Sequence, residues 1–345
     1  MSRGQRTTTS KTLLSSIPSI TPQPFQPNQK DDIREHLQNE GWAAVSVVTE
    51  DEAADLLSQF WDFIEDLGSG VLRHDPITWG PNQWPEQIRG ILKRYGIGQA
   101  PFMWSLRTNE NVLRVFADLW SCHPTDLLTS FDGACIYPVG APGGPQGPFV
   151  LQEDELWPHR DQAPTRNDLL CVQGSVSLAD NRGENDGGLL VWPRTHHIDW
   201  TRSDPKARFG REFYRIPSDC IPHRDARVIR VPAGTLLLWD SRTVHANRAP
   251  SSGGNTRCVA FICMLDGSSA DTSTLMRRME ARTRGDTTSH WPFPFKVNGP
   301  GRAARGRADP EDIIKRRRER GDFEDSRDSE IMKSLIGGYL SHLDE

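Results

Sequence analysis

The chain has 345 residues, enough for one large folded unit or for two of ordinary size. Hydrophobic residues make up 36% and charged residues 25%, which is typical of a globular protein, and no apolar run approaches the roughly 20 residues that cross a bilayer. The net charge of −5 gives no general attraction to nucleic acid, so we expect neither nucleic acid nor membrane as a partner.

Residues 1–30 are rich in Ser, Thr, Pro and Gln and contain no acidic residue. This composition predicts a disordered arm; the alternative is a mitochondrial import signal, which is also basic, hydroxylated and free of acids. The six cysteines form no C-x-x-C pair, and no secretory signal is evident. We therefore expect reduced thiols and a cytoplasmic location.

Residues 31–125 are predicted to be mainly helical. A first amphipathic helix should end at Gly41, and a short apolar strand should follow it. Thr49, followed by acidic residues, is typical of the N-cap of a second helix. A third helix is predicted over 111–120.

Beyond residue 130 the sequence changes to short apolar runs separated by Gly, Pro, Asn and Asp. Many short strands with frequent turns indicate a sandwich, barrel or jelly roll. We expect a jelly-roll core at about 130–266 within one domain, 31–297, followed by a charged helical extension, 298–345. The predicted strands are 131–137, 149–151, 169–178, 188–192, 227–231, 235–239 and 257–264.

Three His-x-Asp triplets occur in the chain: His159/Asp161, His197/Asp199 and His223/Asp225. At a strand end, period-2 alternation points both side chains of such a triplet to the same face. A third ligand from a later histidine would complete the two-His, one-carboxylate arrangement that holds Fe(II) and leaves three coordination positions open. A bidentate 2-oxo acid and dioxygen can then occupy those positions.

Position along the chain favours the pair His159/Asp161 with His245 as the third ligand. About four predicted strands separate Asp161 from His245, whereas Asp225 precedes His245 by only 20 residues. The other partner for that second pair, His290, is followed by Pro-Phe-Pro-Phe rather than by a clean strand. We interpret the remaining two triplets as surface or turn residues.

His245 comes shortly after the predicted buried strand 235–239. Arg257 follows it by twelve residues and opens the last predicted strand. Its planar guanidinium suits the distal carboxylate of 2-oxoglutarate through paired hydrogen bonds. The alternative is an ordinary surface arginine on a strand.

An ordered set of motifs over about residues 30–295 resembles the phytanoyl-CoA dioxygenase family, especially its fungal members of unassigned substrate. The resemblance implies a mainly β fold with flanking helices, a cupin-like double-stranded β-helix. It also implies that His159, Asp161 and His245 bind iron and that Arg257 binds 2-oxoglutarate. The chain departs from the family at Arg194, where the family more often has Gly, and at Arg160, where many members carry Gln. The motifs are Gly41-Trp42, Trp104-Ser-Leu-Arg107, Ser130-Phe-Asp-Gly133, Trp157-Pro-His-Arg-Asp-Gln162, Asp186–His196, Gly234–His245 and Arg257.

The resemblance implies oxidation of an unactivated C–H bond of a small molecule, a specialised metabolite or amino-acid derivative. Hydroxylation, desaturation or cyclisation would accompany the release of succinate and CO₂. The carboxylate of Asp161 argues against a halogenase, which needs that position vacated for chloride. The sequence gives neither the substrate nor the oligomeric state.

Further site residues are predicted only from their neighbourhood in the sequence. Gln173 would face the cosubstrate, and Trp104, Arg107 and Arg160 would line the substrate side. For each of them, packing or a surface salt bridge is the alternative.

Two alternative functions stay open at this stage. One is a metal-dependent cupin-type enzyme that does not use 2-oxoglutarate, and the other is a binding protein without catalysis. A protein kinase is dismissed, although His159-Arg160-Asp161 copies its catalytic triplet, because Asn167 is one position late and no Gly-rich loop precedes the triplet.

Overall fold

The computed structural model describes residues 17–80, 82–140, 156–217, 219–301, 309–323 and 329–338. The predicted strand 149–151 and residues 1–16 of the predicted arm lie outside this part. Residues 17–30 differ from the prediction, because they are ordered. Strand β1 (Ser19–Ile20) pairs with β10 (Arg227–Ile229), and Phe25 bridges to Val45. The apolar side chains of this segment explain why it packs on the core.

The helices predicted in the N-terminal part are present. Helix α2 (Lys30–Glu40) ends at Gly41, which adopts the left-handed backbone with φ of 81°. Strand β2 (Trp42–Ser46) follows, and α3 (Glu50–Asp66) begins with a capping box between Thr49 and Glu52. Helices α4 (Pro101–Arg107) and α5 (Glu110–Trp120) complete this part.

Two β-sheets form the centre of the molecule and confirm the predicted double-stranded β-helix. The six-stranded sheet has the order β1-β10-β8-β12-β6-β9, and the second sheet has the order β2-β11-β7-β13-β5-β3, with β4 beside β13. Apart from the parallel β1–β10 pair, all pairings of named strands are antiparallel. The bounds not yet given are β3 (Ile91–Leu92), β4 (Leu127–Thr129), β5 (Ala134–Tyr137), β6 (His159–Arg160), β7 (Val172–Ser177), β8 (Gly188–Trp192), β9 (Tyr214–Arg215), β11 (Thr235–Asp240), β12 (Val244–Arg248) and β13 (Arg257–Asp266).

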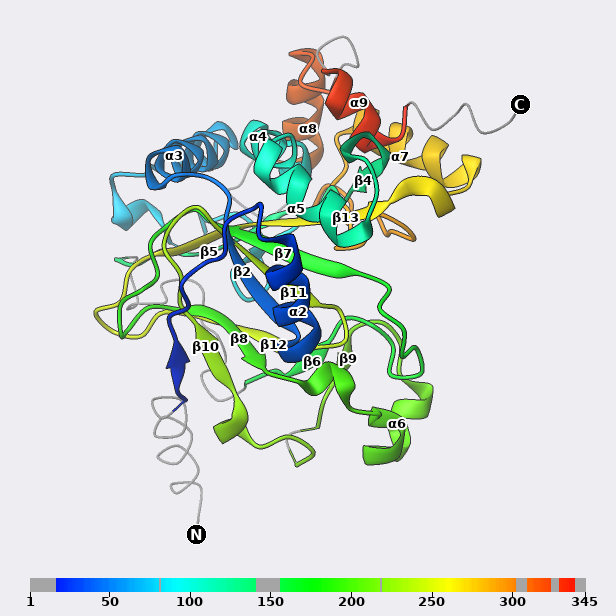
Figure 1. Ribbon diagram of the computed structural model, residues 1–345. Coiled ribbons are helices and arrows are strands. Elements are labelled where there is room, and N and C mark those ends of the chain that lie inside the picture. Colours follow the sequence, from blue (N-terminus) through cyan, green and yellow to red (C-terminus); the bar gives the residue numbers. More distant parts are fainter. Residues whose placement is uncertain are drawn as a thin grey trace.

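Most of the helices lie on the outer side of the sheet that contains β13 (Figure 1). The C-terminal part adds α7 (Thr272–Arg284), α8 (Pro310–Glu319) and α9 (Glu330–Ile336), whereas the short α6 (Trp200–Ser203) lies beside the other sheet. The predicted C-terminal extension is therefore helical where it is described, and Ile313, Phe323 and Leu335 are buried. No helix in the described ranges is long and apolar enough to cross a membrane.

The turn between β11 and β12 is held by Gly41. The carbonyl oxygen of Gly41 accepts hydrogen bonds from the backbone N–H of Asp240 (3.0 Å) and the hydroxyl of Thr243 (2.8 Å). A Cβ atom at Gly41 would lie 2.4 Å from Thr243 Oγ1 and 2.5 Å from His196 Nδ1. The end of α2 therefore sets the position of the turn that leads into β12.

Substituting Gly41 should test this contact. We expect Gly41→Ala to lower the free energy of unfolding by about 2–4 kcal/mol, since it adds a steric clash to the cost of a left-handed Ala. Gly70 is the matched control, because its φ is 85° and nothing lies within 4 Å of its added Cβ. Gly70→Ala should cost only about 1–2 kcal/mol. If urea denaturation showed the same loss of unfolding free energy for both variants, the role assigned to Gly41 would be contradicted.

Candidate metal centre

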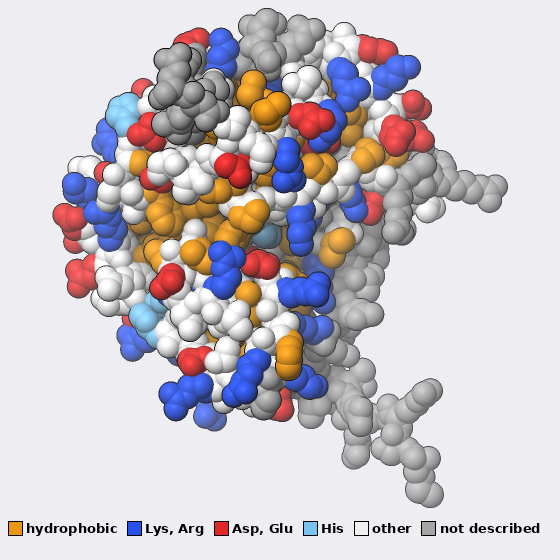
Figure 2. Space-filling view, turned by 90° about the vertical axis from the view of Figure 1, so that its right-hand side faces the viewer, with side chains coloured by type: hydrophobic (Ala, Val, Ile, Leu, Met, Phe, Trp, Pro, Cys, Tyr) orange, Lys and Arg blue, Asp and Glu red, His pale blue; other side chains and the backbone are white. Residues whose placement is uncertain are grey.

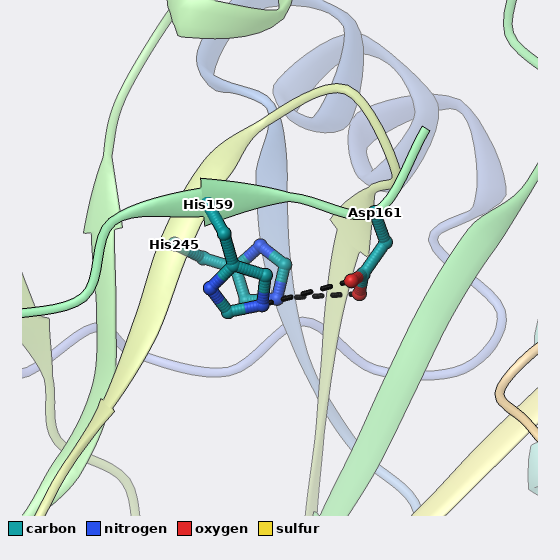
Figure 3. A group of neighbouring side chains, drawn as sticks. All are labelled: His159, Asp161 and His245. Carbon is teal, nitrogen blue, oxygen red and sulfur yellow. Dashed lines mark ion pairs between the residues drawn. The ribbon is translucent and has the colours of Figure 1, made fainter. Parts of the chain in front are cut away.

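His159, Asp161 and His245 converge inside the β-helix (Figure 3). His159 Nε2 lies 3.6 Å from Asp161 Oδ1, and His245 Nε2 lies 3.5 Å from Asp161 Oδ2. One ligand atom from each of the three side chains lies within 4.8 Å of the other two. All three residues are buried, so the group forms a polar centre that is shielded from bulk water.

The pairing of two strands brings these residues together. In β6, His159 stands directly opposite His245 of β12. Alternation then places Asp161 on the same side as His159 and turns Arg160 to the opposite side. The backbone N–H of Asp161 donates to the carbonyl of Ser241 (3.1 Å), in the turn before β12. The last position of the triplet is thereby tied to the strand that carries His245.

Both imidazoles are oriented through their Nδ1 atoms. Nδ1 of His159 lies 3.1 Å from the carbonyl oxygen of Trp157, and Nδ1 of His245 lies 3.0 Å from that of Thr243. Because a carbonyl can only accept, each Nδ1 carries the proton, and each Nε2 keeps its lone pair. The lone pairs point towards the carboxylate of Asp161, the direction from which a shared metal ion would be bound.

Gln173 has a different contact from the one predicted. Its amide nitrogen donates to Asp161 Oδ2 at 2.9 Å. This bond fixes the orientation of the carboxylate, as groups behind metal ligands commonly do. A direct contact between Gln173 and a cosubstrate stays a prediction.

Burial and charge together set the protonation of this centre. Burial, helped by the neighbouring His245, lowers the pKa of His159 to about 3. Burial also lowers the pKa of His245. Burial alone would raise the pKa of Asp161, but the imidazoles of His159, His290 and His245 and the Gln173 hydrogen bond lower it below its ordinary value. Neutral imidazoles beside an ionised carboxylate are the protonation state in which these groups bind metals.

The centre opens into a cavity of about 370 Å³. Apolar and aromatic side chains dominate its wall, which is typical of small-molecule sites. On the face shown in Figure 2, hydrophobic side chains gather near the middle and Lys and Arg side chains stand around them. The lining residues are Ile88, Arg89, Ile91, Lys93, Trp157, His159, Asp161, Leu189, Phe213, Arg215, Trp239, His245, Asn247, Phe261 and His290.

Arg257 is buried on β13 and is not among the residues that line this cavity. It lies on the same face of the strand as Phe261, four residues further on, which does line the cavity. Its guanidinium donates to the thiol of Cys135 at 3.6 Å, and in the described part of the chain it has no carboxylate partner.

The three residues predicted to contact substrate are not among the lining residues. The guanidinium of Arg107 is buried and donates to the backbone carbonyls of Gly98 (2.5 Å) and Asp132 (3.0 Å). The indole N–H of Trp104 donates to Gln99 Oε1 (3.1 Å) in the helical layer. Arg160 donates to the carbonyl of Gln162 (2.7 Å) on the far side of β6. Their substrate contacts stay predictions without support from these positions.

The two other His-x-Asp triplets lie in turns, as interpreted from the sequence. His223–Asp225 forms a short 3-10 helix, and His197 and Asp199 are exposed. Sequence reasoning missed β12 as a strand, and with it Asn247, which lines the cavity two residues after His245. The alternation of His245 and Asn247 was the signal available. His290 was considered only as a metal ligand and was not predicted to line a cavity.

Two curated relatives match most of the chain. The Ava biosynthesis cluster protein O of Aspergillus versicolor is 28% identical over 252 residues, which cover 68% of this chain and 77% of that protein. A Dictyostelium discoideum protein provisionally named phytanoyl-CoA dioxygenase is 23% identical over 273 residues, which cover 68% of this chain and 74% of that protein. This chain resembles the phytanoyl-CoA dioxygenases. The resemblance inferred from the motifs is therefore confirmed.

No protein-family model matches the chain. Among solved structures, the epimerase SnoN in complex with Fe³⁺, α-ketoglutarate and nogalamycin RO is 16% identical, with a TM-score of 0.45. The match covers 70% of this chain and 84% of SnoN.

Removing the Gln173 hydrogen bond should weaken metal binding. We expect Gln173→Leu to lower Fe(II) affinity about 10- to 100-fold, the usual effect of losing a group that orients a ligand. Ser175→Ala is the control, because Ser175 is buried two residues further along the same face of β7. Anaerobic competition with a chelator measures the affinity. Unchanged affinity in a folded Gln173→Leu protein would contradict this role.

The pKa shift of His159 predicts how acid affects the metal-free protein. The unfolded chain takes up a proton on this histidine below about pH 6.5, whereas the folded chain does not until far lower pH. Stability should therefore fall as pH falls, by roughly 1 kcal/mol from this group between pH 6.5 and 5.5. Urea denaturation of chelator-treated protein should show a smaller fall in stability between pH 6.5 and 5.5 for His159→Gln than for wild type. Exposed His197→Gln should behave like wild type.

Proposed function

We propose that this protein is an Fe(II)- and 2-oxoglutarate-dependent dioxygenase that oxidises an unactivated C–H bond of a small molecule. The observation that carries the proposal is the convergence of His159, Asp161 and His245 on one side of an apolar cavity. Two neutral imidazoles and one carboxylate, with room left on the cavity side, are the donor set typical of non-haem Fe(II) oxygenases.

The residues present fit an Fe(II) ion. His159 and His245 would each offer Nε2, and Asp161 would offer a carboxylate oxygen that Gln173 holds in place. Bound iron, 2-oxoglutarate and dioxygen would supply the oxidising chemistry, with release of succinate and CO₂. The chain itself excludes water with the aromatic wall of the cavity and fixes the ligand orientations beforehand.

Arg257 suits the distal carboxylate of 2-oxoglutarate. A buried guanidinium costs free energy unless its donors are satisfied. Arg278, which is also buried, shows the contrast, since it donates to four backbone carbonyls, those of Thr129, Pro292, Leu335 and Ile336. Arg257 has only a thiol partner in the described ranges, which leaves donors for a bound carboxylate.

The size and character of the cavity favour a mainly apolar small molecule as substrate. A volume of about 370 Å³ falls within the range of small-molecule sites, and its wall carries several aromatic rings. The named relative from a biosynthesis cluster agrees with a role in specialised metabolism. Whether the outcome is hydroxylation, desaturation or cyclisation depends on which substrate atoms the wall presents to the metal.

A cytoplasmic location, as predicted from the cysteines, agrees with the six free thiols.

An anaerobic titration with Fe(II) and 2-oxoglutarate tests the proposal. We expect the weak visible charge-transfer band of a chelated 2-oxo acid in wild-type protein and its loss in His245→Ala. Arg257→Ala should need at least about tenfold more 2-oxoglutarate, because a buried charge-assisted pair is lost. Arg194→Ala, which removes an exposed arginine, should behave like wild type.

Two results would overturn the proposal in different ways. Iron binding without the band in wild-type protein would favour a cupin-type metal enzyme that does not use 2-oxoglutarate. Tight binding of small molecules without succinate release under oxygen would favour a binding protein.

A further inference from the structure

His290 stands at the cavity wall on a segment that is tied to the core. Next to it, the backbone N–H of Thr288 donates to the carbonyl of Phe131 (2.8 Å), and the N–H of Phe131 donates to the hydroxyl of Thr288 (3.0 Å). Thr288 also bridges to Val297 on the returning part of the segment. The position of His290 is therefore set by the strand-bearing core, although it follows α7 in a region without regular strands.

One edge of the His290 ring is occupied. Nδ1 forms a short hydrogen bond and ion pair with the carboxylate of Asp132, which is buried. The second carboxylate oxygen accepts from the N–H of Gly133 at 2.7 Å. The opposite edge carries Nε2, which has no hydrogen-bond partner in the described part of the chain. His290 lines the cavity, and its side chain keeps 24% of its exposure.

Two motifs that the metal centre does not use meet behind this histidine. Arg107, from the Trp104–Arg107 motif, donates to the carbonyl oxygen of Asp132 at 3.0 Å, in the Ser130–Gly133 motif. A Cβ atom on Gly133 would lie 2.0 Å from the carbonyl oxygen of Leu92. Residue 133 can therefore pack this closely against Leu92 only if it is glycine. The motifs thus form a rigid support for an imidazole that faces the cavity.

The charges around the cavity favour an anion beside His290. Among the described lining residues, Lys93 is basic in addition to His290, and Asp161 is acidic. A bound metal ion would offset the charge of Asp161. Burial alone would lower the pKa of His290, but the carboxylate of Asp132, with a smaller contribution from that of Asp161, raises it above the ordinary value. Because the Asp132 carboxylate at Nδ1 favours the protonated imidazole, Nε2–H can donate a charge-assisted hydrogen bond to an anion.

We propose that His290 is a substrate-binding residue, whose Nε2–H donates to a carboxylate on a substrate with an apolar, aromatic-sized body. This inference rests on the proposed function, because it concerns the substrate of the same metal centre. Asp132 is a positioning residue in this arrangement, since it acts by orienting the imidazole. Holding the carboxylate at His290 would decide which carbon of the apolar body lies nearest to the metal.

Indole-3-acetate and its neutral amide, indole-3-acetamide, are suitable probes, because they share size and shape and differ in charge. Calorimetry would measure both affinities anaerobically, with and without Fe(II) and 2-oxoglutarate. We expect wild-type protein to bind the acetate at least about tenfold more tightly than the amide. His290→Ala should lower the affinity for the acetate about 10- to 100-fold and change the affinity for the amide little, since a charge-assisted hydrogen bond is removed. His290→Lys should recover part of the preference.

Further variants separate binding from folding. Asp132→Asn should reduce the preference for the acetate, and exposed His197→Ala should leave it unchanged. Each variant should keep the charge-transfer band with Fe(II) and 2-oxoglutarate, which shows an intact metal centre. The inference is overturned if wild type shows no preference for the acetate, or if His290→Ala keeps it. Absence of the charge-transfer band in wild-type protein would instead overturn the proposed function, whatever the affinities for the acetate and the amide.

Discussion

The short pairing of β6 with β12 is the constraint on which the metal centre depends. It places His159 opposite His245, and the hydrogen bond from Asp161 to Ser241 extends the contact by one more position. Strand β6 has only two residues, and of these only His159 pairs with β12, so the pairing gains little from the sheet itself. Its position depends on β12, on β9 at its other side and on the turn that Gly41 supports.

Burying two imidazoles and a carboxylate is costly unless every polar atom has a partner. Here the Nδ1 atoms donate to backbone carbonyls, and Gln173 donates to the carboxylate. The remaining polar atoms, the Nε2 lone pairs and carboxylate oxygens, face one another across 3.5 and 3.6 Å without a shared proton. Such a centre has unused lone pairs that a cation would satisfy.

The buried arginines of this molecule differ in their hydrogen-bond partners. Arg278 and Arg107 are held by backbone carbonyls, and Arg107 supports the segment that carries Asp132. Arg257 differs, because a thiol is its one partner in the described ranges. Burial by itself therefore does not separate a structural arginine from a binding one. What distinguishes Arg257 from Arg107 and Arg278 is that its one partner in the described ranges is a thiol, with neither a carbonyl nor a carboxylate beside it.

The sequence by itself determined the elements whose periodicity is local. The short apolar runs predicted seven of the sheet strands, β2 among them, and Gly41 and Thr49 predicted helix ends. The spacing of His-x-Asp and His245 selected three residues that do converge. Only the tertiary structure decided which side chains meet from distant segments. It directed Gln173 to Asp161, took Trp104, Arg107 and Arg160 away from the cavity and brought His290 into its wall. Strand and helix periods fix the direction of a side chain within its own element, whereas contacts between residues more than 100 positions apart, such as Asp132 and His290, depend on how the elements pack.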